Sequence, residues 1–225
     1  GREERAALFD AMVTTMAAIH RLDVVALGLS DYGRPGNYFA RQLNRWSQQW
    51  FTQYRKGDDD NPALDRLVAW LGERVPDSEL LRLCHGDFRI GNVMFHPTEP
   101  RVVGVLDWEL STLGHPLADF AYHCMAWHIP PGAFRGIGGL DLAALGIPSE
   151  DEYIRLYCER TGLATPQALK ADWNFYMAYN MFRIAAILQG IAKRVEAGTA
   201  SSAQARKSAE GAIPMAQMAW RFASA

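Results

Sequence analysis

Three polar side chains at fixed spacing are the most informative feature of this chain. Asp87 is followed by Asn92 five positions later, and Asp107 ends a short β-branched run fifteen residues beyond that. A carboxylate such as Asp87 can accept the proton of a hydroxyl group, and amide and carboxylate oxygens are ligands that Mg²⁺ prefers. Phosphoryl transfer from ATP needs both, a base for the acceptor hydroxyl and oxygen ligands for the metal. The spacing therefore predicts phosphoryl-transfer chemistry.

Each of these residues, taken alone, is better explained as a turn residue. Asp and Asn are common in tight turns such as Gly86-Asp87, and Asp107 stands at a strand end. The three together are harder to explain by turns, because each stands where the phosphoryl-transfer reaction needs it. We therefore interpret Asp87 as the catalytic base, and Asn92 and Asp107 as the metal ligands.

The composition indicates a globular domain and excludes several classes of protein. The 225 residues are 49% hydrophobic and include seven Trp, so a sizeable core can form. The net charge of −2 gives no basic excess for nucleic acid or a membrane surface. No apolar run reaches the roughly 18 residues that span a bilayer, and no signal peptide opens the chain. Cys84, Cys124 and Cys158 are typical of reduced, buried thiols, so we expect a cytoplasmic protein with no nucleic-acid or membrane partner.

The apolar periodicity predicts a mainly α-helical chain with a small β-hairpin region. Helical spacing is found in residues 3–22, 38–55, 63–75, 118–127, 150–161, 165–197 and in one last helix after residue 200, with a break near Pro214. Short β-prone runs lie at residues 81–84, 92–95 and 101–106, beside the three polar residues. The Gly-rich residues 136–139 are interpreted as a flexible connection.

Two stretches carry a family resemblance, residues 84–92 (CHGDFRIGN) and residues 106–119 (LDWELSTLGHPLAD). They resemble the aminoglycoside phosphotransferase and choline kinase-like family, and more narrowly its branch akin to the kinase domain fused to some acyl-CoA dehydrogenases. The resemblance implies a protein kinase-like fold, with Asp87 as the base and with Asn92 and Asp107 bound to Mg²⁺. It also implies ATP as co-substrate, while GTP stays open as the alternative donor.

Four further residues near the motif are expected in supporting roles. By resemblance, His85 packs and hydrogen-bonds the catalytic loop. Asp119 follows a Gly-x-Pro-x-x-Asp turn and either caps a helix or anchors the backbone of that loop. Glu109 either reaches Mg²⁺ through water or has a surface or capping role. Arg89 either neutralises the transferring phosphoryl group or pairs with a nearby acid.

The same resemblance implies two lobes with ATP between them. The N-terminal lobe of the family supplies a Gly-rich loop, a strand Lys and a helix Glu, and no segment before residue 85 shows this pattern. We expect residues 1–225 to form a single domain, the C-terminal helical lobe with the N-terminal lobe absent. Helices would occupy residues 1–80, catalytic and metal-binding loops residues 81–120, and a helical acceptor-binding part residues 121–225. Negligible phosphotransfer is expected of this chain alone.

The long helix expected over residues 165–197 is the candidate acceptor-binding element. Asn180 and Arg183 share one of its faces, at a helical step of three residues. Core packing explains this face equally well, with the aliphatic part of the Arg side chain along the core and its charged group in water. In the functional interpretation, Asn180 and Arg183 line the acceptor pocket and Trp127 adds an apolar wall, although core packing is the commoner fate of Trp.

The charge of this helix bears on the acceptor. Asp172 and Glu196 are the only acids in residues 166–200, whereas a polycationic aminoglycoside needs a cluster of carboxylates. We therefore expect a small-molecule acceptor with a hydroxyl group that is neutral or anionic. Hydroxy acids and their acyl thioesters fit this description, and the branch resemblance points the same way.

Two other functions compete with this interpretation. A non-catalytic, pseudokinase-type binding or regulatory lobe would use the helical surface for partners, but the intact set of Asp87, Asn92 and Asp107 argues against it. A metal-dependent hydrolase would draw on several imidazoles and a carboxylate, namely His85, Asp87, His115, His123 and His128. His123 and His128 are five apart, whereas zinc ligands on one helix follow spacings such as H-x-x-x-H.

Overall fold

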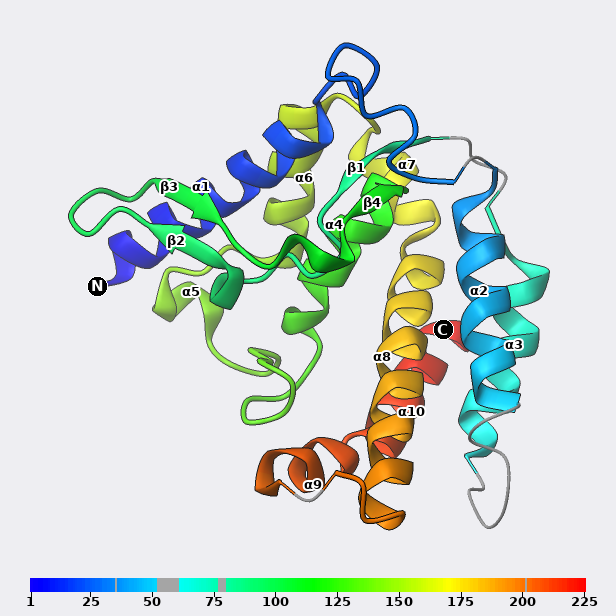
Figure 1. Ribbon diagram of the computed structural model, residues 1–225. Coiled ribbons are helices and arrows are strands. Elements are labelled where there is room, and N and C mark those ends of the chain that lie inside the picture. The colour runs from blue at the N-terminus through cyan, green and yellow to red at the C-terminus, as the bar shows by residue number, and fades with distance from the viewer. Residues whose placement is uncertain (35, 52–60, 77–79, 201) are drawn as a thin grey trace. The chain divides into compact units, whose positions relative to one another are not determined.

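The computed structural model describes residues 1–34, 36–51, 61–76, 80–200 and 202–225, whose helices and strands are shown in Figure 1. Backbone contacts divide the chain into two compact units, each assembled from two stretches of sequence. The first unit comprises Gly1–Gly36 and Leu80–Ala171, and the second comprises Asn37–Glu79 and Asp172–Ala225. The predicted catalytic motif therefore lies entirely within the first unit.

Helix α1 (Arg2–His20) packs against α6 (Glu150–Thr161) in the core of the first unit. The buried residues of α1 recur at helical spacing, as in Met12, Met16 and Ile19, so the helix has one apolar face. The other helical segments of this unit are α4 (Pro116–Cys124), α5 (Leu142–Leu145), α7 (Pro166–Ala171) and the short 3₁₀ helices η2 (Ile90–Asn92), η3 (Trp108–Leu110) and η4 (Met125–Trp127). Helices α1 and α4 of this core contact the strands of the unit.

Two small antiparallel sheets complete the first unit. Strand β1 (Arg82–Cys84) pairs with β4 (Thr112–Gly114), and β2 (Val93–Phe95) pairs with β3 (Val102–Val105). The β2–β3 hairpin is thus nested between the two strands of the outer pair. Nesting places the chain that leaves β1 beside the chain that enters β4, which brings residues 85–92 and 106–111 together.

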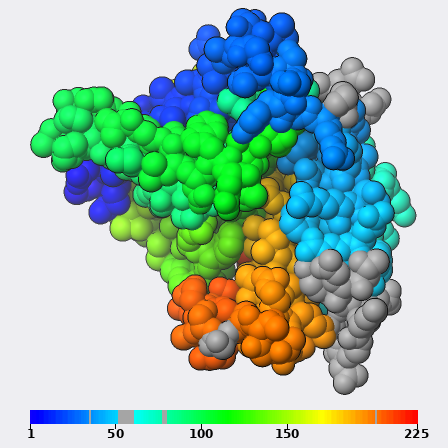
Figure 2. All heavy atoms as spheres, in the orientation of Figure 1, coloured from blue at the N-terminus to red at the C-terminus, as the bar shows by residue number. Residues whose placement is uncertain are grey.

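The mainly helical fold with small antiparallel strands confirms the expected fold class in its coarse form. Strand β4 was not expected, because three residues that include a Gly give almost no periodicity. In Figure 2 the blue surface that includes residues 24–34 adjoins the green surface of the first unit. The Tyr32 hydroxyl and Ser111 Oγ are 2.5 Å apart, and Gly33 packs against Leu113. A loop thus shields the short ladder that holds the catalytic loop.

The second unit is a bundle of helices around α8 (Trp173–Glu196). Helix α10 (Ala212–Ala223) packs along α8 and α3 (Pro62–Glu73), while α9 (Ala203–Ala209) packs on α8. Helix α2 (Tyr38–Gln49) contributes Phe39, whose ring meets the rings of Phe175 and Tyr179 edge-on at 5.1 Å. Such aromatic contacts add to the burial of apolar area and give this unit its own core.

Two of the expected helices are divided in the structure. The helix over residues 165–197 breaks at Asp172, so α7 and α8 are separate and belong to different units. The helix after residue 200 breaks at Gly211, while Pro214 stands inside α10. Proline is tolerated in the first turn of a helix because its missing N–H would have no partner there, so Pro214 gives no break. Of the helix expected over residues 38–55, α2 accounts for the first part, and residues 52–55 lie outside the described chain.

The Gly-rich residues 136–139 are not a free connection. The N–H of Ile137 donates to Ala126 O, and the N–H of Gly138 donates to Ile129 O, each at 2.8 Å. Gly136 is packed so closely on Ile129 O that a Cβ atom has no room. The loop is therefore fixed on η4 and on the residues that follow it.

The three cysteines of the first unit are buried and form no disulfide among the residues that the structure describes. Burial raises the pKa of the Cys84 and Cys124 thiols far above the ordinary value, so both stay protonated. None of the described helices combines the length and the apolar character that a membrane crossing needs.

Candidate active site

Asp87 lies in the loop between β1 and η2, on a backbone that only glycine permits at the preceding position. Gly86 has φ +83°, and a Cβ atom there would lie 2.5 Å from the carbonyl oxygen of Leu110. An L-residue at this φ is strained whatever the space, and here the space is also absent. The close approach presses the Asp87 loop against the residues that follow Asp107.

Three side chains donate hydrogen bonds to the Asp87 carboxylate. The Tyr122 hydroxyl donates to Oδ1 at 2.5 Å, while Arg89 Nε and Asn92 Nδ2 donate to Oδ2 at 3.0 and 2.9 Å. Burial raises the pKa of Asp87, but these hydrogen bonds and the Arg89 charge lower it more, so the pKa lies below its ordinary value. Asp87 is thus an ionised base held in one orientation.

A fourth group approaches the same carboxylate from the loop after η4. Arg135 Nη1 lies 3.9 Å from Asp87 Oδ1. The Asp87 side chain is 16% exposed, so it is reached from solvent between its donors. Two guanidinium groups therefore flank the base, Arg89 from the same loop and Arg135 from another.

The predicted metal ligands follow the base along the β2–β3 hairpin. Asn92 immediately precedes β2, and the N–H of Leu106 donates to its carbonyl oxygen at 2.8 Å, which places Asp107 one residue beyond this pair. Because Asn92 Nδ2 donates hydrogen bonds to Asp87, the amide oxygen of Asn92 is the side-chain atom that can bind a cation.

Asp107 suits a cation site. It has φ 67° and ψ 54°, a left-handed conformation that Asp tolerates better than most residues. The residue is exposed, and its carboxylate contacts no donor among the described residues. An exposed carboxylate, one residue beyond the hydrogen bond from Leu106 to Asn92, fits Mg²⁺, which takes few protein ligands and keeps several waters.

His85 ties the two loops together. Its Nε2 donates to the carbonyl oxygen of Leu106 at 2.8 Å, and its Nδ1 accepts from the backbone N–H of Asp87 at 3.2 Å. The His85 ring is 1% exposed and lies against Trp108, with ring centroids 4.7 Å apart. His85 therefore positions the base and the residue before Asp107 without facing solvent.

Asp119 anchors the backbone of the Asp87 loop. Its carboxylate accepts from the N–H of His85 at 2.7 Å and from the N–H of Gly86 at 2.9 Å. His20 Nε2 lies 3.2 Å from the same carboxylate, and His20 Nδ1 is 2.7 Å from the Tyr157 hydroxyl. Burial raises the pKa of Asp119, but the hydrogen bond and charge of His20 and the two backbone donors lower it more. Helix α4 starts at Pro116, so Asp119 lies one turn inside the helix and does not cap it.

The other expected site residues are distributed as follows. Arg89 pairs with the base itself, and Glu109 is exposed in η3. Trp127 lies in the wall of an apolar cavity of the first unit and donates from Nε1 to Pro148 O at 2.9 Å. Asn180 and Arg183 lie on α8 in the second unit, where Asn180 donates to Tyr176 O. Their role in acceptor binding stays a prediction.

The imidazole set of the alternative hydrolase does not form a metal site in the described part of the chain. There, the only group of His, Cys, Asp and Glu close enough for a common ion is His20, Cys84 and Asp119. All three are buried, the Cys84 thiol is protonated, and the carboxylate is occupied by donors. His123 and His128 are directed instead to Tyr153 and Glu150. The cluster of His20, Cys84 and Asp119 is therefore a structural anchor.

Three site residues were missed by reasoning on the sequence, namely Tyr122, Arg135 and His20. Tyr122 stands three positions after Asp119 on α4, so a shared helix face was a usable signal. Arg135 and His20 give no such signal, because long-range packing alone brings them to Asp87 and Asp119.

Replacing Tyr122 by Phe tests its contact with the base. Loss of the hydroxyl donor removes one of the groups that favour the ionised form, so the pKa of Asp87 rises. In a catalytically competent protein, we expect the acid limb of the kcat/KM pH profile to move to higher pH and kcat to fall several-fold. Tyr32→Phe, which removes a hydroxyl bound to Ser111, is the matched control. An unmoved acid limb would contradict the role of Tyr122.

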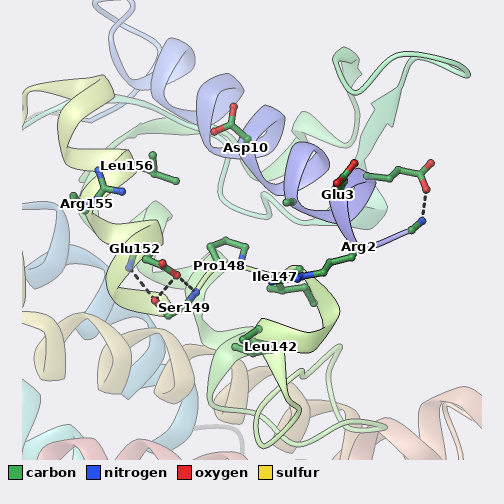
Figure 3. Close-up of a pocket in the computed structure, with 15 residues that line it drawn as sticks. Arg2, Glu3, Asp10, Leu142, Ile147, Pro148, Ser149, Glu152, Arg155 and Leu156 are labelled. Atoms are coloured by element: carbon green, nitrogen blue, oxygen red, sulfur yellow. Dashed lines mark hydrogen bonds and ion pairs between the residues drawn. The ribbon is translucent and has the colours of Figure 1, made fainter.

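A wider hollow of the first unit lies away from the Asp87 loop (Figure 3). It measures about 1080 Å³ and is lined by α1 residues such as Asp10 and by the start of α6. Ser149 and Glu152 cap α6 through reciprocal hydrogen bonds, and Arg155 pairs with Glu159 at 2.7 Å. These groups serve the helix and the surface, and they provide control positions for the experiments below.

One protein family matches most of this chain. The family model described as "Phosphotransferase enzyme family" matches residues 1–158. A Ralstonia eutropha protein that carries the name aminoglycoside phosphotransferase has a solved structure similar to this one, with a TM-score of 0.92 and 54% identity. The match covers 100% of this chain and 67% of that one. A choline kinase from Cryptosporidium parvum has a TM-score of 0.63 at 12% identity, over 96% of this chain and 65% of its own, and so shares the fold.

The chain is also similar to part of a larger mouse protein. Acyl-CoA dehydrogenase family member 10 of Mus musculus is 43% identical over 223 residues. The match covers 98% of this chain but 20% of the mouse protein, so the chain spans one fifth of the length of that relative. The relationship confirms the resemblance that the sequence motifs carry.

Proposed function

Since the chain belongs to the phosphotransferase enzyme family, we propose that it transfers the γ-phosphoryl group of ATP to a hydroxyl group of a small molecule, with Mg²⁺. The observation that carries the proposal is the Asp87 carboxylate, which is ionised and oriented by Tyr122, Arg89 and Asn92. A general base must stand within hydrogen-bond reach of the proton that it accepts, and a fixed carboxylate in a partly open site meets that need.

Each residue of the site has a defined part in this reaction. Asp87 accepts the proton of the acceptor hydroxyl and orients its oxygen toward the γ-phosphorus, in line with the leaving oxygen. Asn92 and Asp107 would hold Mg²⁺ through their side-chain oxygens. When bound, the ion supplies positive charge that offsets charge on the phosphate oxygens. His85 and Asp119 keep the Asp87 loop in the required conformation.

We place this chain as the helical lobe of a larger enzyme. The relatives that match are longer than this chain, which covers 20% of the mouse protein and 67% of the Ralstonia eutropha protein. The nucleotide would then lie between this lobe and a second one, as the family resemblance implies.

We further propose a reducing compartment, the cytoplasm, because Cys84, Cys124 and Cys158 are buried thiols.

The proposed acceptor is a neutral or anionic hydroxyl compound, such as a hydroxy acid or its acyl thioester. Helix α8 and its flanks contribute few carboxylates, which disfavours a polycationic aminoglycoside. The name of the mouse relative refers to acyl-CoA, and this supports an acyl compound as the acceptor. No nucleic acid or membrane is part of the proposal.

Arg183 on α8 is proposed to contact the acceptor, and Arg183→Ala tests this. Loss of one charge-assisted hydrogen bond to a bound acceptor costs about 1.5–3 kcal/mol, so KM for an anionic acceptor should rise at least tenfold. The kcat should change little, because Arg183 is not assigned to the reacting atoms. Steady-state kinetics in a protein with both lobes give the answer. An unchanged KM would remove Arg183 from the acceptor site.

The function itself is tested by acceptor-dependent ADP release. A protein that joins this chain to a nucleotide-binding lobe is supplied with Mg²⁺-ATP and a library of hydroxylated compounds. We expect phosphorylated product from one or more hydroxy acids or thioesters, and negligible turnover by residues 1–225 alone. Product is identified by mass spectrometry. Turnover by the 225 residues alone would overturn the assignment of the lobe, and absence of any product from the longer protein would favour a binding lobe.

A further inference from the structure

An apolar cavity of about 270 Å³, partly open to solvent, lies beside Asp87 within the first unit. Three of its wall residues, Arg89, Tyr122 and Arg135, are the residues that bond or approach the Asp87 carboxylate. The cavity therefore opens next to the proposed base. Its volume falls near the lower end of that of small-molecule pockets, about 300 Å³.

The wall is apolar apart from a few groups. It is built from α1, the Asp87 loop, η4 and the loop that follows, with apolar side chains from Leu8, Phe9, Met12, Phe88, Ile90, Met125, Ala126, Trp127, Phe134, Ile137 and Ile147. Burial lowers the pKa of His123, another wall residue, to about 4, so its ring is neutral at pH 7. Such a cavity favours binding of an apolar part of a ligand, because apolar surface is thereby removed from water.

The charges in the wall of the cavity are all positive, and the Asp87 carboxylate lies beside it. Arg5, Arg89 and Arg135 line it, and its wall contains no Asp or Glu among the described residues. Arg5 donates from Nε to Leu145 O at 2.6 Å, and Arg89 is paired with Asp87 at 3.0 Å. The Arg135 side chain is 45% exposed and lies 3.9 Å from Asp87, beyond a direct hydrogen bond. Arg135 is thus the cation best placed to accept a new anionic partner.

The backbone conformation of Arg135 and of the residue before it is strained. Phe134 and Arg135 have φ of 34° and 63°, two consecutive non-glycine residues in a sparsely populated region. Such residues cost about 1–3 kcal/mol each, and they cluster at ligand-binding sites. The hydrogen bond from the N–H of Ile137 to the carbonyl oxygen of Ala126 holds the two strained residues in place, and so does the close packing of Gly136. The loop is thereby built to present Arg135 at the edge of the cavity.

We propose that this cavity binds the apolar body of the acceptor, that Arg135 binds an anionic group on it, and that its hydroxyl meets Asp87. The inference rests on the proposed function and narrows it to a compact amphiphilic anion, an aliphatic or aromatic body with a carboxylate or similar group. An ammonium compound is disfavoured, because the three cations Arg5, Arg89 and Arg135 in the wall outnumber the single carboxylate beside it. Arg135 acts here as a specificity-determining residue.

Binding to residues 1–225 tests the pocket without nucleotide. Three probes share one chain and differ in the head group: octanoate, octanol and octylammonium. Isothermal titration should give octanoate a Kd at least tenfold lower than octylammonium. Arg135→Gln should raise the Kd of octanoate about tenfold, because a charge-assisted contact is lost. The Kd of octanol should not change. Equal Kd values for octanoate and octylammonium, or no effect of Arg135→Gln, would overturn the proposal.

A second variant tests the cavity by filling it. Ala126→Phe places a ring in the apolar space, so octanoate and octanol should both bind at least tenfold more weakly. Ala6→Leu and Arg155→Gln, at the wider hollow, are matched controls and should leave every Kd unchanged. Unchanged binding by Ala126→Phe would contradict this cavity as the binding site. If Ala126→Phe does not fold, Arg135→Gln, which changes an exposed side chain, still tests the proposal.

The pocket and the proposed reaction fail separately. If the variants weaken octanoate as expected but the longer protein phosphorylates no hydroxy acid, the pocket stands and the reaction is wrong. If the longer protein phosphorylates hydroxy acids while Arg135→Gln and Ala126→Phe leave both octanoate binding and KM unchanged, the reaction stands and the pocket is wrong.

Discussion

Asp87→Asn is expected to reduce kcat for phosphoryl transfer by about a thousandfold in a protein that carries both lobes. A positioned general base contributes about 10²–10⁴ to the rate, and the amide cannot accept the proton of the acceptor hydroxyl. The backbone N–H groups of His85 and Gly86 keep their hydrogen bonds to Asp119, so the loop should keep its conformation. Rates of product formation at saturating acceptor, followed by mass spectrometry, give the measurement.

The controls for Asp87→Asn separate chemistry from folding. Arg155→Gln, at the surface of α6, should leave kcat unchanged. The KM for the acceptor should change far less than kcat, because the base acts mainly in the transition state. A melting temperature near that of the parent protein would exclude unfolding as the cause. A kcat within tenfold of the parent value would remove Asp87 from the role of base.

Asp119→Ala is expected to lower the free energy of unfolding by about 3–5 kcal/mol, the cost of breaking a buried ionic group with its donors. The N–H groups of His85 and Gly86 would lose their acceptor, and His20 would lose its partner. Such a loss is a large share of the roughly 5–15 kcal/mol that stabilises a domain. Urea denaturation followed by tryptophan fluorescence measures it.

A surface carboxylate provides the comparison for Asp119. Asp10 pairs with Arg160 on the exposed side of α1, so Asp10→Ala should cost at most about 1 kcal/mol. Asp119→Asn should fall between the two, since the amide keeps one acceptor atom. Equal destabilisation by Asp119→Ala and Asp10→Ala would show that the anchor contributes no more than a surface pair.

The anchor should also show the pH dependence of a carboxylate. The pKa of Asp119 lies below its ordinary value of 3.8 in the folded protein. Its contribution to stability is therefore present above the unfolded pKa and is lost as the pH falls through the folded pKa. The difference in unfolding free energy between the parent protein and Asp119→Asn should narrow as the pH is lowered from neutral into this acidic range. A constant difference would mean that Asp119 stabilises the loop without its charge.

The sequence by itself predicted the chemistry and determined much of the local structure. The spacing of Asp87, Asn92 and Asp107 predicts a base and two metal ligands whatever the fold, because the reaction constrains these residues directly. Apolar periodicity located the helices of both units, since burial of one helical face imposes its spacing on the sequence. The Gly-x-Pro-x-x-Asp turn likewise marked Asp119, although two roles were open to it.

Only the tertiary structure decided which groups surround these residues. Tyr122 and Arg135 reach Asp87 from 35 and more positions away, and His20 reaches Asp119 across 99. Contacts between such distant residues leave no periodic pattern, because they depend on how helices and loops pack. The pairing of β1 with β4 is of the same kind. The apolar cavity with Arg135 at its edge exists only once α1, η4 and the strained loop have come together.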